Sequence, residues 1–281
     1  MSNEILNERA VTHGKLLTFS FYLLVFSSYL CPMTITEIIV TILLGTTAGF
    51  INTFAGGGSM LVVPFLIFIG LPANVANATN RIAILLQNVV SVGSFKQKKI
   101  LDFKTDSKLL LPVALGSIAG AFIAVDINEE IFKKVIAGLL IIMFFMLLLN
   151  PDAWVKANAD KAKMKSPWLR NVIFFLLGIY GGFIQIGIGF FLLAGLVLGC
   201  GYDLLKANAI KLFIVLFYTI IALAIFIWND LVDLKVGLIL ACGNMLGAWL
   251  GVRFSIKWGA KYIRYFLLVV LVIVAARLLF S

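Results

Sequence analysis

The sequence predicts an all-α polytopic membrane protein with two tandem inverted-topology repeats, each carrying a broken or re-entrant half-helix after a glycine-rich break. Three observations predict this fold class. First, the 281 residues are 62% hydrophobic with a mean hydropathy of +1.08, and only 13% are charged, too few to cover a soluble domain. Second, the apolar residues form blocks of about twenty, the length at which a helix spans a bilayer. Third, the blocks recur along the chain at one constant offset.

Helices are the spanning structure because the apolar blocks lack the period-2 alternation of a membrane β-barrel. The apolar blocks are 16–33, 36–54, 59–71, 76–96, 106–126, 130–150, 168–185, 188–200, 206–228, 234–255 and 261–280. Blocks 59–71 and 188–200 have only about thirteen residues, too few to cross unaided, and whether they cross fully stays open. Each follows directly on a glycine-rich break, at Ala55–Ser59 and at Gly187–Gly189.

An offset of 131 residues relates the two halves of the chain. It takes Gly56 to Gly187, Gly58 to Gly189 and Asn77 to Asn208. The predicted organisation is an N-terminal segment 1–35 with one extra apolar helix, a transmembrane repeat 36–150, a linker 151–167 and a transmembrane repeat 168–281. The block 16–33 could instead be a signal-peptide core, although no small-residue cleavage site follows it, or translation could start at Met33.

The distribution of charge predicts that the repeats are inverted. Basic residues cluster at 97–105, 151–167 and 255–261, which the positive-inside rule places in the cytoplasm. The loops 126–130 and 229–234 are then outside, so that equivalent loops fall on opposite sides, as in many secondary transporters. We therefore expect a multi-pass protein of the cell inner membrane with a cytoplasmic linker.

Composition also excludes several classes of function. The net charge of +10 is explained by the loop clusters, so we expect no nucleic-acid partner. Cys31, Cys200 and Cys242 lack CxxC spacing and the only histidine is His13, so we expect no metal site, no cofactor and no enzyme. The acids lie in loops or at block ends, which leaves no carboxylate proton relay. A Na⁺ site of backbone and hydroxyl oxygens stays open, and the sequence is compatible with a homo-oligomer.

The two glycine breaks are the first candidate site. A half-helix that begins near the membrane midplane presents unpaired N–H groups and about half a positive charge, which together bind anions. Since unpaired backbone groups cannot face lipid, the breaks must be buried or line a wet cavity. The glycines of this site permit irregular backbone and close approach of a ligand. The alternative is close packing of helices through small residues.

The second candidate site is a set of polar residues at the starts of two long blocks, where Asn80 maps onto Lys211. Ionisable groups within spans usually face a partner or a cavity, although a cation near a helix end can also reach the headgroups. Further amides lie deeper, at Asn52, Gln87, Gln185 and Asn244, either lining the pathway or forming interhelical hydrogen bonds. The predicted substrate-binding residues are Asn52, Gly56, Gly57, Gly58, Ser59, Asn77, Thr79, Asn80, Arg81, Gln185, Gly187, Gly189, Asn208 and Lys211.

The first half resembles a known family. The glycines from Gly49 to Gly58, then Pro64, Gly70-Leu71-Pro72 and Ala76-Asn77-Ala78-Thr79, resemble the sulfite exporter TauE/SafE family. The second half repeats the theme more loosely over 178–209, and the resemblance covers 36–280. It implies an exporter or transporter of small anions such as sulfite and sulfur-containing organic acids. Ile188, Gly195 and Ile210 depart from the pattern, at the places of Gly57, Pro64 and Thr79.

Together these observations predict a secondary transporter whose partners are a small anionic solute and the lipid bilayer. It would move a sulfite- or organosulfonate-like anion across the cytoplasmic membrane, by export. The alternatives are an anion channel and an importer of a small organic acid or other solute.

Overall fold

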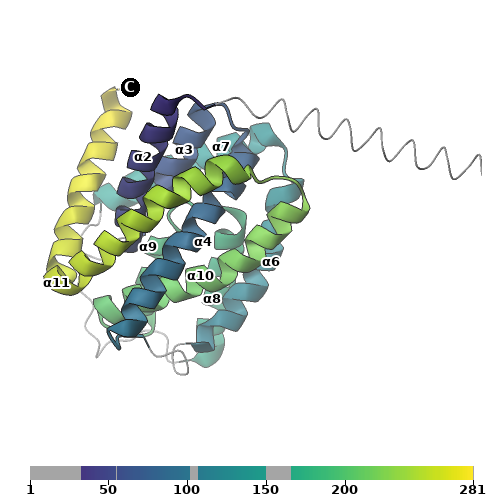
Figure 1. Ribbon diagram of the computed structural model, residues 1–281. Helices are drawn as coiled ribbons and strands as arrows, with labels where there is room; N and C mark the ends of the chain where they lie inside the picture. The colour runs from purple at the N-terminus through teal and green to yellow at the C-terminus, as the bar shows by residue number, and fades with distance from the viewer. Residues whose placement is uncertain (1–32, 55, 102–106, 150–165, 281) are drawn as a thin grey trace, which may run out of the picture. The chain divides into compact units, whose positions relative to one another are not determined.

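The computed structural model describes residues 33–54, 56–101, 107–149 and 166–280, and all regular structure within them is helical (Figure 1). The predicted helix at 16–33 and linker positions 151–165 lie outside the described residues, as do His13 and Cys31.

Contacts divide the chain into residues 1–39 and 40–281. In the first unit, the described residues form the start of a helix. The Thr34 N–H donates to Glu37 Oε2 at 2.8 Å, and the Glu37 N–H donates to Thr34 Oγ1 at 3.2 Å. This reciprocal pair is a capping box, which satisfies backbone donors at a helix N-terminus.

The helices follow the predicted blocks closely. The first predicted repeat contains α2 (Ile35–Phe54), α3 (Ser59–Phe68), α4 (Ala73–Gln97), η1 (Ser107–Leu109), α6 (Leu110–Asp126) and α7 (Glu129–Leu149). The second contains α8 (Pro167–Phe183), α9 (Ile188–Ala194), the π-helical η3 (Gly195–Gly199), α10 (Leu204–Trp228) and α11 (Leu234–Phe280). The helices therefore stop at both glycine breaks, as predicted.

Within the described residues, four helices are long and apolar enough to cross a membrane: Ile35–Phe54, Ser107–Asp126, Leu204–Trp228 and Leu234–Lys257. The helix α4 has 25 residues, but its buried Asn, Gln and Arg side chains lower its mean hydropathy. The segments Ser59–Phe68 and Ile188–Gly199 are short apolar helices, so the prediction of two short elements after the breaks is confirmed.

The C-terminal helix differs from the prediction. A loop was expected at 255–261 between two spans, but α11 is one helix of 47 residues, whose ribbon changes direction between its green and yellow parts (Figure 1). The expectation rested on the basic residues around Arg253 and Lys257. Lys and Arg are good helix formers, so a basic cluster alone does not end a helix.

Glycines bring α6 and α8 into close contact, side by side (Figure 1). A Cβ atom at Gly116 would meet the carbonyl oxygen of Phe175, and one at Gly178 would meet that of Val113. Small residues of this kind let helix backbones approach closely in a membrane.

The helices α2 and α11 pack through equivalent glycines. A Cβ atom at Gly243 would meet the carbonyl oxygen of Ile42, and one at Gly45 would lie 2.6 Å from that of Leu240. The contact residues of α8 have counterparts in α2 that lie 133 positions earlier, so Gly178 corresponds to Gly45. The contact residues of α6 have counterparts in α11 that lie 127 positions later, so Gly116 corresponds to Gly243. The constant offset of 131 therefore does not describe these flanking helices, because the break and the loops differ in length between the two halves.

Candidate functional site

The two glycine breaks lie against each other. Gly56 has φ +98° and Gly187 has φ +71°, values in the left-handed region that side chains rarely adopt. A Cβ atom at Gly56 would lie 2.7 Å from the carbonyl carbon of Gly189, and one at Gly189 would lie 2.5 Å from the Gly56 Cα. Backbone from residues 133 positions apart thus meets at one point with no room for a side chain.

The remaining residues of the first break contact both halves. A Cβ atom at Gly57 would lie 2.7 Å from the ring of Phe190, and one at Gly58 would meet the carbonyl oxygen of Ala48. Ser59, the first residue of α3, is buried, and its Oγ accepts a hydrogen bond from Asn80 Nδ2 at 3.2 Å. The N-terminus of α3 therefore lies beside the polar stretch of α4.

The polar residues of α4 reach across to the end of α8. Asn77 Nδ2 donates to the Phe183 carbonyl at 3.0 Å, and the Gln185 N–H donates back to Asn77 Oδ1 at 3.3 Å. Arg81 Nη2 donates to the Gly182 carbonyl at 2.6 Å, while Nη1 donates to Gln185 Oε1 at 3.2 Å. The guanidinium also lies over the Phe226 ring, 4.8 Å from its centroid.

The polar residues of α10 make the reciprocal contacts with the end of α2. Asn208 Nδ2 donates to the Thr53 carbonyl at 2.9 Å, and Lys211 Nζ donates to the Asn52 carbonyl at 3.1 Å. The C-terminal carbonyls of a helix lack partners within that helix and carry its negative end. An amide and a cation from each half therefore cap the broken helix of the other half.

These contacts show where the two cations lie. Arg81 and Lys211 are 0% and 1% exposed, so the alternative in which they extend to the headgroups is wrong. The helices begin at Ala73 and Leu204, three and two residues earlier than the predicted blocks, so both cations lie deeper in their helices than expected. They contact the C-terminal carbonyls of α8 and α2 directly.

Thr79 lies apart from this group. Its Oγ1 accepts a hydrogen bond from the Asp233 N–H at 2.9 Å, and the Asp233 carboxylate accepts from the Val236 N–H at 2.9 Å. Thr79 thus anchors the start of α11. This contact explains why Thr79 is buried without requiring a ligand.

A buried amide cluster joins α2, α4 and α11. Asn52 Nδ2 and Asn244 Nδ2 donate to Gln87 Oε1 at 3.3 and 3.4 Å, and Gln87 Nε2 donates to Asn88 Oδ1 at 3.5 Å. The interhelical hydrogen bonds expected of Asn52, Gln87 and Asn244 are therefore present. Asn88 was missed, although an amide beside Gln87 in an apolar block was visible in the sequence. Gln185, the other deep amide, holds Arg81.

Tyr218 was also missed, because an aromatic residue in an apolar block is an ordinary core residue. It is fully buried, and a Cβ atom at Gly181 would lie 3.1 Å from its hydroxyl. At an offset of 131, Tyr218 occupies the place of Gln87. Both halves thus place a polar side chain at this depth.

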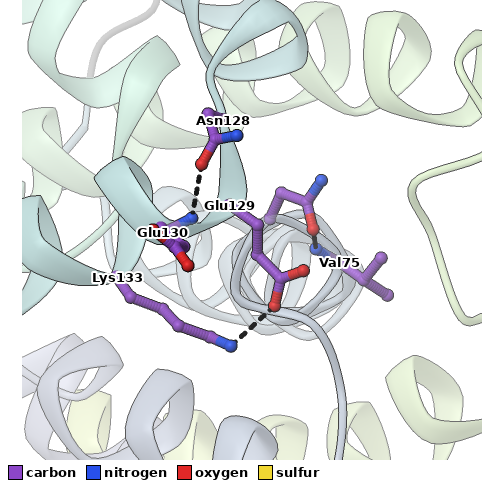
Figure 2. A network of polar contacts seen from close by, with 6 residues as sticks. Val75, Asn128, Glu129, Glu130 and Lys133 are labelled. Carbon is purple, nitrogen blue, oxygen red and sulfur yellow. Dashed lines mark hydrogen bonds and ion pairs between the residues drawn. The ribbon is translucent and has the colours of Figure 1, made fainter.

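The turn between α6 and α7 carries a network of polar contacts (Figure 2). Lys133 Nζ lies 2.8 Å from Glu129 Oε1, and the Glu130 N–H donates to Asn128 Oδ1 at 2.9 Å. The hydrogen bond and charge of Lys133, with the Ala73 N–H at the start of α4, lower the pKa of Glu129. The carboxylate therefore lies at a helix N-terminus, which favours negative charge.

The buried cations have no ion pair among the described residues. Within the described ranges, neither Arg81 nor Lys211 has a carboxylate at ion-pair distance, and the described residues hold no cluster of His, Cys, Asp and Glu that could bind a metal. Cys200 and Cys242 are free.

Comparison with known proteins identifies the family. The sulfite exporter TauE/SafE family model matches residues 41–278. The chain belongs to the TauE/SafE family. A "probable membrane transporter protein ORF9" from Sinorhizobium sp is 30% identical over 83% of this chain and 88% of its own length. "Probable membrane transporter protein YfcA" from Escherichia coli K12 is 28% identical over 83% of this chain and 86% of its own.

A more distant relative, "probable membrane transporter protein YunE" from Bacillus subtilis, is 22% identical over 86% of this chain and 97% of its own. No solved structure matches. This TauE/SafE member is a multi-pass membrane protein of a transporter family, and the matched residues include both breaks and both buried cations.

Proposed function

We propose that this protein is a secondary transporter that exports a small sulfite- or organosulfonate-like anion across the cytoplasmic membrane. One observation carries the proposal: Arg81 and Lys211 are buried beside the two breaks with no acidic partner among the described residues. A buried cation is costly unless it is paired. The compensating negative charge for each comes from a helix C-terminus, which supplies about half a charge, and the other contacts of Arg81 are with the neutral Gln185 amide and the Phe226 ring.

The surplus of positive charge is what an anion would neutralise. It amounts to roughly half a charge at each cation, in an environment where charge interactions are weakly screened. Ser59 and Asn80 connect the N-terminus of α3 to the same stretch of α4 as Arg81, so a second source of positive potential lies nearby. An anion held there would contact both halves.

The arrangement of the helices supports an inverted pair of repeats. Arg81 caps α8 and Lys211 caps α2, so each half completes the broken helix of the other. The glycine-lined helix pairs α6–α8 and α2–α11 also correspond to each other, with α8 matching α2 and α6 matching α11. Each pair therefore joins one helix from each half of the chain. In many transporters, two inverted repeats enclose a substrate site at their interface, and movement of one repeat against the other gives alternating access to that site.

Export follows from electrostatics. The membrane potential of a negative-inside cell favours outward movement of an anion by about 2.3 kcal/mol per charge per 100 mV. No proton relay is needed for that direction. The family model carries the name of a sulfite exporter, which agrees with an oxyanion substrate.

The test is efflux of sulfite and of a small sulfonate from proteoliposomes under an inside-negative potential. Arg81→Gln and Lys211→Gln keep hydrogen-bonding groups but remove the charges. Because charge-assisted hydrogen bonds contribute about 1.5–3 kcal/mol, we expect efflux to fall roughly tenfold to a hundredfold. Arg253→Gln is the matched control, since Arg253 is exposed and its guanidinium stacks on Trp249 at 3.5 Å. Full efflux in both charge-removing variants would refute the site.

The same vesicles separate a transporter from an anion channel. A transporter shows saturation and acceleration of efflux by anion on the opposite side, because its halves must return between turnovers. A channel shows neither at the same potential. Uptake against an inside-negative potential would indicate the importer instead.

A further inference from the structure

Both broken helices end on a cation that comes from the opposite half. At the end of α2, the Asn52 carbonyl accepts from Lys211 Nζ at 3.1 Å and the adjacent Thr53 carbonyl accepts from Asn208 at 2.9 Å. At the end of α8, Arg81 donates to the Gly182 carbonyl at 2.6 Å. The two ends are thus capped by the same combination of charge and amide.

The two cations do not occupy equivalent positions in the repeat. At an offset of 131, Lys211 corresponds to Asn80, and Arg81 corresponds to Leu212. A side chain kept only for packing would keep its position and size. In both halves a positively charged side chain donates to the C-terminal carbonyls of a helix. We conclude that these helix ends require a positive charge.

A metal cation could meet the same requirement. Half-helix C-terminal ends and unwound carbonyls coordinate Na⁺ in transporters with discontinuous helices. The ammonium of lysine is a compact point charge with three donors, close to a monovalent ion in the contacts it needs. The same end of α2 also carries the Thr53 hydroxyl, whose Oγ1 lies 3.2 Å from Ser91 Oγ.

We propose that the C-terminus of α2 is a monovalent-cation site that this chain fills with its own Lys211 ammonium, so that transport needs no bound Na⁺. Arg81 supplies the positive charge at the C-terminus of α8. The consequence for transport rests on the proposed function. The existence of the cation site does not rest on the proposed function, because cation binding can be measured on purified protein.

Removing the Lys211 side chain leaves room beside the Asn52 and Thr53 carbonyls, and this predicts a gain of ion binding. For purified Lys211→Ala, we expect the midpoint of thermal unfolding to rise in NaCl relative to choline chloride at equal ionic strength. The rise should be roughly 5–10 °C once Na⁺ exceeds its Kd about a hundredfold. Wild type and Lys206→Ala, a variant of an earlier lysine on α10, should show no difference between the two salts.

A second variant controls for loss of charge alone. Lys211→Met fills the space with an apolar chain, so Na⁺ cannot enter and should give no rescue. Lys211→Arg retains a cation and should stay independent of Na⁺. If Lys211→Ala shows the same midpoint in NaCl and choline chloride, the site does not exist.

The flux experiment tests the coupling, and its wild-type arm does not depend on any variant folding. Wild-type efflux should be unchanged when choline replaces Na⁺ on both sides, whereas Lys211→Ala efflux should recover at least tenfold in Na⁺. Wild-type efflux that requires Na⁺ would overturn the inference. Absence of any wild-type anion flux would instead refute the proposed function, and the thermal measurement would still decide the cation site.

Discussion

Gly56 and Gly189 meet backbone to backbone, so closely that a Cβ atom on Gly189 would lie 2.5 Å from the Gly56 Cα. The two residues belong to different halves of the chain. Their contact brings the end of α2 and the start of α9 together, and the caps formed by Arg81 and Lys211 cross between the same halves. The two glycine breaks therefore pack against each other and depend on contacts from both halves of the chain.

Substituting either contact glycine should destabilise the protein. Gly56→Ala adds a methyl group against the Gly189 backbone and strains a residue with φ +98°. Overpacking of this kind costs about 1–3 kcal/mol, to which the left-handed backbone adds about 1–2 kcal/mol. Thermal unfolding in detergent measures the loss. Gly93→Ala is the control, because nothing lies within 4 Å of the added methyl group; equal loss in both variants would contradict the contact.

The amide caps should contribute similarly at the two breaks. Asn77→Ala and Asn208→Ala each leave a helix carbonyl, Phe183 or Thr53, without its donor. We expect each variant to lose about 1–3 kcal/mol of unfolding free energy, the cost of an unsatisfied buried polar group. Urea unfolding monitored by tryptophan fluorescence measures both losses. A loss confined to one variant would show that the two ends are not equivalent.

Thr79→Val should separate stability from transport. The valine removes the acceptor of the Asp233 N–H at the start of α11 while keeping the shape of the side chain. Stability should fall by about 1 kcal/mol, but sulfite efflux per folded molecule should stay within about twofold of wild type. A severalfold loss of efflux at unchanged stability would support the predicted place of Thr79 in the substrate site.

The pH dependence of stability should include a contribution from Glu129. Its pKa is lowered below the ordinary value of 4.5 by Lys133, so the folded state holds the proton less tightly than the unfolded state. The stabilisation is therefore present above pH 4.5 and is lost as the pH falls through the lowered folded pKa. Thermal midpoints from pH 3 to 7 should show a smaller acid loss in Glu129→Gln than in wild type. Glu130→Gln is the neighbouring control, and an unchanged acid profile in Glu129→Gln would contradict the assignment.

Much of the candidate site could be predicted from the sequence. Glycine runs inside apolar blocks predict breaks, and Asn77, Arg81, Asn208 and Lys211 stand out because polar groups are costly within spans. The partners of those side chains could not be predicted. Arg81 donates to Gly182, about a hundred residues away, and no local pattern encodes that contact. Thr79 was included for its neighbours alone, and Tyr218 was hidden by its apolar surroundings.

The sequence by itself determined the membrane class, the two breaks and the short helices after them, because hydropathy and backbone freedom are properties of each segment. Tertiary structure alone decided that the cations cap helix C-termini, that Gly56 meets Gly189, and that α11 continues past Lys257. These outcomes depend on how helices far apart in the chain pack against one another. A buried cation takes whichever carbonyls that packing brings within reach.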